Sequence, residues 1–88
     1  MIDDKNIKVC RDKIDELDER LVKIFEERLG IAKEISEYKK ARGLQILDSD
    51  REEKLITRIK NISCKEMAEY NEELFIKIME LSKRHQSR

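Results

Sequence analysis

Apolar residues recur at alternating spacings of three and four over the first forty residues, which is the heptad pattern of one long amphipathic helix. The pattern predicts a helix over about residues 5–42, and no proline interrupts it. Arg28 occupies the one place in the series where an apolar residue is expected. The apolar stripe consists of Ile7, Cys10, Ile14, Leu17, Leu21, Ile24, Ile31, Ile35 and Tyr38.

A helix of this length spans about 55 Å, because each residue adds about 1.5 Å. A compact chain of 88 residues has a radius of gyration of only about 12 Å. The helix therefore cannot belong to a single-chain globule, and we expect its apolar stripe to pack against a second chain. An arginine inside that stripe is the first indication that the seam contains a site.

Two shorter helices are predicted after the long one. The basic last turn is followed by Gly43, which we expect to end the first helix in the left-handed conformation. A second helix is predicted over about residues 49–61, where Ser49 and Glu52 have the S-x-x-E spacing of a capping box. Its expected buried side consists of Leu55, Ile59 and Ile62.

The third helix is predicted over about residues 64–86, and Ser63 and Glu66 again have the spacing of a capping box. It carries two neighbouring stripes. The first consists of Met67, Tyr70, Leu74, Ile78 and Leu81, and the second of Phe75, Met79, Ser82 and Gln86. Polar residues thus take the last two places of the second stripe.

Composition favours an all-α fold, because proline is absent and 45% of residues are charged. With the pattern above, we expect three helices per chain, and the length of 88 residues predicts a single domain over residues 1–88. Twenty basic and twenty acidic residues cancel, which argues against nucleic acid or an anionic membrane as a partner. Two scattered cysteines predict neither a disulfide framework nor a metal site. With no membrane-length apolar run and no signal-peptide pattern, we expect a cytoplasmic protein.

Helical geometry decides which of the cations can share a ligand. Arg28 and Lys39 are eleven positions apart, so they lie within about 20° of each other around the axis and about 16 Å apart along it. Arg11 lies about 25 Å from Arg28 and about 100° away around the axis. It can therefore join such a site only from an antiparallel partner chain. The planar guanidinium group suits carboxylates, so an anionic small molecule is the expected ligand.

Ordinary structural roles would also explain these residues one by one. Arg28 could pair with a carboxylate such as Glu27, and Lys39 could be a charge at a helix end. Asp48 and Glu52 suit a helix start, and Arg51 suits an exposed first turn. Periodicity alone predicts a helical dimer with several cations near its seam.

Four local patterns, in order along the chain, resemble those of the all-helical chorismate mutases from about Ile7 to Gln86. Residues 11–18 have the form R-x-x-I-D-x-x-D, and residues 48–52 have the form D-x-x-R-E. Between them lie Glu27-Arg28, then Ala32 and Lys39. The last pattern covers residues 75–82, with Gln86 four positions further on. Each pattern is weak by itself, but their order and spacing together are specific.

The resemblance implies an intertwined homodimer that converts chorismate to prephenate in phenylalanine and tyrosine biosynthesis, without cofactor or metal. Three arginines would hold the two carboxylates of chorismate: Arg28, Arg51 and, from the partner chain, Arg11. Ser82 would assist them. Asp48, through its backbone N–H, and Glu52 would hold the ring hydroxyl. Lys39 and Gln86 would donate to the ether oxygen. The residues expected to act in catalysis are Lys39, Gln86, Arg28 and Glu52.

Two alternatives from other functional classes are considered beside the mutase. An isochorismate–pyruvate lyase on the same fold would share the arginines and the lysine, but it usually lacks the acidic pair present here as Asp48 and Glu52. A non-catalytic helical dimerisation module would leave all the charges at the surface. The resemblance also allows a complex with another enzyme of the shikimate pathway.

Overall fold

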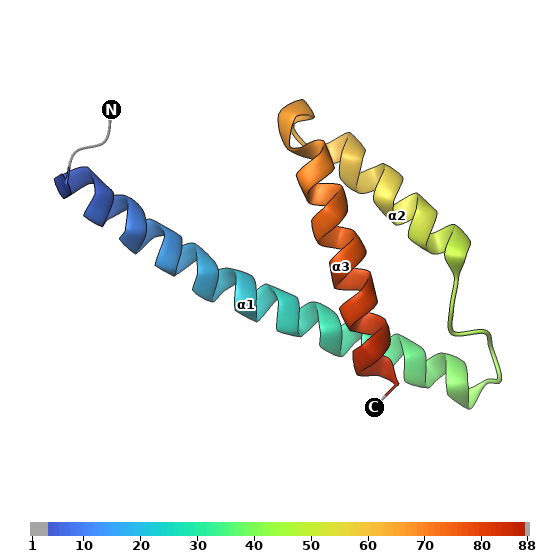
Figure 1. Cartoon of the computed structure of the whole chain (residues 1–88). Coiled ribbons are helices and arrows are strands. Elements are labelled where there is room, and N and C mark those ends of the chain that lie inside the picture. Colours follow the sequence, from blue (N-terminus) through green and yellow to red (C-terminus); the bar gives the residue numbers. More distant parts are fainter. Residues whose placement is uncertain (1–3, 88) are drawn as a thin grey trace. The chain divides into compact units, whose positions relative to one another are not determined.

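The computed structural model describes residues 4–87 and confirms the all-α class, with one long and two shorter α-helices (Figure 1). The helices are α1 (Asp4–Ala41), α2 (Ser49–Ile62) and α3 (Ala68–Gln86), and the short 3-10 helix η1 (Lys65–Met67) precedes α3. The chain divides into two compact units, residues 1–31 and residues 32–88. The prediction of a single domain remains a prediction. Among the described residues, no helix combines the length and apolar content that crossing a membrane requires.

Residues 4–31 of the first unit are the amino-terminal part of α1, and none of the apolar side chains among these described residues is buried. Ile14, Leu17, Leu21 and Ile24 are each between 54% and 59% exposed. A lone helix has no opposing surface, so an amphipathic stripe can be buried only by packing against another element. The heptad stripe is thus present but uncovered in the single chain.

The second unit begins with the last turns of α1, which end in a Schellman motif. Leu44 N donates to Lys39 O at 2.8 Å, and Gly43 N donates to Lys40 O at 3.2 Å. Gly43 has a φ of 66°, which confirms the predicted left-handed cap. The guanidinium of Arg42 stacks 3.8 Å from the centre of the Tyr38 ring. These contacts fix the backbone that carries Lys39.

The start of α2 corrects the expected capping box. The N-cap is Asp48 rather than Ser49, and its Oδ1 accepts a hydrogen bond from Arg51 N at 3.0 Å. A carboxylate satisfies an open N–H and also interacts well with the positive end of the helix dipole, so it replaces the hydroxyl. The side chain of Glu52 is therefore not used in a cap, and its carboxylate forms an ion pair elsewhere.

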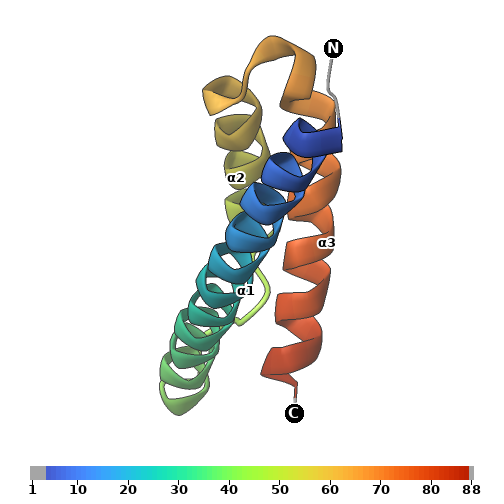
Figure 2. The ribbon, with the colours of Figure 1, turned by 90° about the vertical axis from the view of Figure 1, so that its left-hand side faces the viewer.

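Helices α2 and α3 pack side by side and antiparallel (Figures 1 and 2). Ion pairs at both ends of the helix pair give its direction: Lys60 near the end of α2 contacts Glu72 near the start of α3, and Glu52 contacts Lys83. Ile59 is 7% exposed and is the buried apolar residue between them. Ile62 was predicted to be buried but is 70% exposed, because it is the last residue of the helix.

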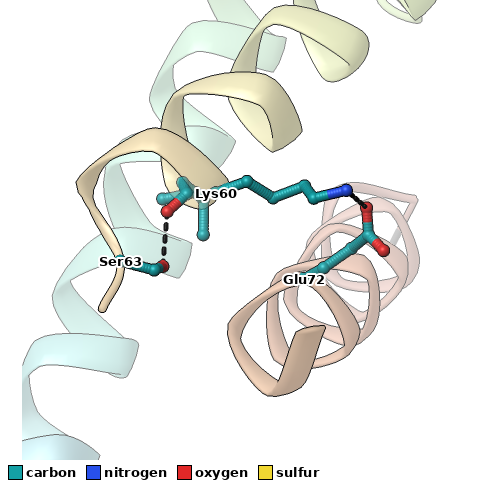
Figure 3. A network of polar contacts seen from close by, with 4 residues as sticks. Lys60, Ser63 and Glu72 are labelled. Carbon is teal, nitrogen blue, oxygen red and sulfur yellow. Dashed lines mark hydrogen bonds and ion pairs between the residues drawn. The ribbon is translucent and has the colours of Figure 1, made fainter. Parts of the chain in front are cut away.

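The expected capping box at Ser63 is also wrong. Ser63 Oγ donates back to Ile59 O at 2.5 Å (Figure 3). It also accepts from Asn71 Nδ2 at 2.8 Å, so it joins α2 to α3. Cys64 is the residue before η1, and it makes no side-chain cap. The chain accordingly turns through η1 before α3 begins at Ala68 rather than at about residue 64.

The second stripe of α3 is its better-buried side. Phe75, Met79 and Gln86 are half-buried and Ser82 is buried, whereas Tyr70 at the start of the first stripe is 68% exposed. Two polar residues thus occupy inward positions near the end of α3. A helix that buries polar groups at inward positions must provide them with partners, or it keeps them for a ligand.

Candidate active site

The end of α3 meets the last turns of α1 within the second unit. Gln86 Nε2 donates to the backbone oxygen of Ala32 at 3.5 Å, and Lys40 Nζ donates to the backbone oxygen of Gln86 at 3.4 Å. Lys39 belongs to the same turns of α1 and is half-buried. Its ammonium group forms no ion pair with any residue of the described chain. The structure therefore brings the helical turn of Lys39 and the side chain of Gln86 to one end of the unit.

The first turn of α2 carries three of the predicted site residues. The side-chain oxygen of Asp48 is used by the helix cap, while its backbone N–H donates to no other residue between 4 and 87. Arg51 is exposed and forms no ion pair within that range. Glu52 N donates to Asp48 O at 3.1 Å, so both residues are held by the same helical turn. This turn presents one N–H donor, one guanidinium and one carboxylate.

Glu52 links this turn to α3. Its Oε1 lies 2.7 Å from Lys83 Nζ, and the two side chains are 32% and 45% exposed. Lys83 follows the buried Ser82 and lies one turn before Gln86. The first turn of α2 is therefore attached to the part of α3 that carries the other two predicted ligands.

Two buried hydroxyls lie in the same unit. Ser82 is 5% exposed and Ser36, on α1, is 2% exposed. Ser36 Oγ has no hydrogen-bond partner among the described residues. Ser36 is one turn beyond Ala32, whose carbonyl accepts from Gln86.

The remaining two candidates belong to the first unit. Arg11 is exposed and Arg28 is half-buried, both on α1. Six of the predicted site residues lie in the second unit: Lys39, Asp48, Arg51, Glu52, Ser82 and Gln86.

Sequence reasoning missed Lys83 and Ser36. Lys83 lies on the charged side of α3, so periodicity makes it an ordinary surface residue, and only its contact with Glu52 singles it out. Ser36 lies outside the heptad stripe, and nothing in the apolar pattern predicts its burial. The one available signal was its spacing of four from Ala32 and three from Lys39, which puts all three near one face of the helix.

Comparison with known proteins shows the family to which the chain belongs. The family model of chorismate mutase type II matches residues 10–87. A chorismate mutase of Methanocaldococcus jannaschii is 37% identical over 75 residues, which cover 85% of this chain and 74% of that protein. The match includes all eight predicted site residues, since it begins before Arg11 and ends after Gln86. The chain therefore belongs to the type II chorismate mutase family, and its activity is that of a chorismate mutase, an isomerase.

Proposed function

We propose that the site of the second unit binds chorismate and promotes its rearrangement through Lys39 and Gln86, which donate hydrogen bonds to the ether oxygen. The observation that carries this proposal is the hydrogen bond from Gln86 to Ala32 O, which attaches the end of α3 to the α1 segment that also carries Lys39. Lys39 is half-buried and pairs with no carboxylate of the described chain, so its charge remains available to an anionic ligand.

The reaction needs fixed donors rather than a nucleophile. In this Claisen rearrangement one C–O bond breaks as one C–C bond forms within the same molecule, and negative charge grows on the ether oxygen. A positioned ammonium stabilises that charge more in the transition state than in the ground state, which is the condition for raising kcat. Binding the folded conformer also brings the two reacting carbons together.

The first turn of α2 would hold the ring hydroxyl. The N–H of Asp48 is open, because the helix cap uses only the side chain of that residue. The Glu52 carboxylate would accept a hydrogen bond from the hydroxyl. Arg51 lies between them in sequence and is exposed, so its guanidinium is free to bind a carboxylate of the substrate.

Binding the two carboxylates of chorismate requires cations in addition to Arg51. Arg28 and Arg11 of the partner chain would supply them, and Ser82 would assist. A second chain is supported by the exposed stripe of the first unit, in which Ile14, Leu17, Leu21 and Ile24 are each more than half exposed. Packing this stripe against the same stripe of a second chain would remove its apolar side chains from contact with water. This removal is the main driving force for the association of helices in water. We propose a homodimer in which each chain donates Arg11 to the other.

Kinetics of two alanine variants test these roles. Lys39→Ala should lose kcat by a hundredfold or more, because removing one transition-state donor costs about 3 kcal/mol. Ser82→Ala should lose much less, and Lys77→Ala, which alters an exposed pair with Glu80, serves as the control. Activity is followed as the loss of chorismate ultraviolet absorbance, with prephenate identified by chromatography. Similar small losses in Lys39→Ala and Ser82→Ala would contradict the assignment, and so would release of pyruvate from isochorismate in place of prephenate formation.

A further inference from the structure

The ion pair between Glu52 and Lys83 involves a residue for which the proposed reaction has no role. Lys83 Nζ lies 2.7 Å from Glu52 Oε1, at the short end of the range for a charge-assisted hydrogen bond. Glu52 Oε2 accepts from no other described residue, so one carboxylate oxygen is held and the other is open. The contact joins the first turn of α2 to α3.

We propose that Lys83 is a positioning residue that holds the Glu52 carboxylate in one orientation, so that its open oxygen accepts a hydrogen bond from the ring hydroxyl. This inference rests on the proposed role of Glu52. A glutamate has three side-chain torsions, and a carboxylate with no fixed partner samples many of their combinations. An ammonium held on the adjacent helix removes most of that freedom before the substrate arrives, and such preorganisation is what a binding residue needs.

A matched ion pair separates this role from simple stabilisation. Lys60 and Glu72 join the same two helices at their other end, with Nζ and Oε2 3.5 Å apart (Figure 3). Their side chains are 47% and 32% exposed, against 45% and 32% for Lys83 and Glu52. Exposed ion pairs of this kind contribute little to stability. The two lysines should therefore have similar small effects on the melting temperature and different effects on turnover.

The experiment measures kcat, KM and melting temperature for Lys83→Met, Lys83→Arg, Lys60→Met, Glu52→Gln and the double variant Glu52→Gln/Lys83→Met. Lys83→Met should lower kcat/KM about tenfold, whereas Lys60→Met should change it less than about twofold. Lys83→Arg should recover most of the loss, because a guanidinium can hold the same carboxylate. In the Glu52→Gln background, Lys83→Met should have no further effect, since both changes remove one function.

The outcomes distinguish this inference from the function on which it rests. If Glu52→Gln leaves the kinetics unchanged, the proposed role of Glu52 fails, and this inference fails with it. If Glu52→Gln is impaired but Lys83→Met behaves like Lys60→Met, only the positioning role is overturned. The same conclusion follows if Lys83→Met lowers kcat/KM by an equal factor in both backgrounds, because the lysine then acts without Glu52.

Discussion

Mixing two inactive variants would test whether Arg11 acts across the dimer. Arg11 and Arg28 both lie in the first unit on α1, 17 positions apart, which corresponds to about 25 Å along the helix. Each arginine side chain reaches about 6 Å, so a gap of about 13 Å would remain if both acted from one chain. No small dicarboxylate could contact both. In the proposed site, Arg11 would therefore come from the partner chain.

Arg11→Ala and Arg28→Ala should each be nearly inactive as homodimers. Removing one partner of a desolvated charge pair costs about 3 kcal/mol, which leaves about 1% of kcat/KM. In a mixed dimer, however, one site combines the intact Arg28 of one chain with the intact Arg11 of the other. Random assortment makes half the dimers mixed, each with one intact site of two, so an equimolar mixture should recover about a quarter of wild-type activity.

The assay unfolds and refolds the two variants together, and then follows the loss of chorismate absorbance. The matched control mixes Arg28→Ala with Lys39→Ala. These two residues are assigned to the same half of a site, so no mixed dimer contains an intact one and no activity should return. If the Arg11→Ala and Arg28→Ala mixture gives only the mean of its two components, Arg11 does not act across the interface and the proposed dimer site is wrong.

Changes at four positions test how the fold is held, each by urea unfolding. Ser36→Ala should raise the free energy of unfolding by about 1 kcal/mol, because a better helix former replaces a buried hydroxyl that has no described partner. A lower free energy of unfolding would mean that this hydroxyl makes a hydrogen bond. Gly30→Ala should stabilise by about 1 kcal/mol, since its added Cβ meets nothing within 4 Å. Gly43→Ala should instead lower the free energy of unfolding by about 1 kcal/mol, because the φ of this residue is +66°. If both glycine variants changed the free energy of unfolding in the same direction, this account would be contradicted. Asp48→Ala should cost about 1 kcal/mol through loss of the cap while Asp48→Asn costs little, and equal losses would exclude the cap as the cause.

The local pattern of the sequence was sufficient for the helices and for the ends that depend on backbone geometry. Heptad spacing and the absence of proline predicted α1 within one residue of its observed bounds, 4–41. Gly43 was predicted in the left-handed conformation, because few other residues adopt it without strain. The arginine in the apolar stripe and the four motifs also identified the family, because residue types and their spacing can be read from the sequence without knowledge of helix packing.

Only the tertiary structure decided how polar side chains near the helix ends are used. Asp48 and Ser49 both suit an N-cap, and choosing between them depends on where the chain enters the helix. Ser63 had the spacing of a capping box, yet its hydroxyl contacts Ile59 O and Asn71, since packing of α3 brings that asparagine within reach. Glu52 and Lys83 lie 31 positions apart, and no local pattern could pair them. Hydrogen bonds and ion pairs act over about 3–4 Å, so they depend on helix packing that periodicity cannot specify.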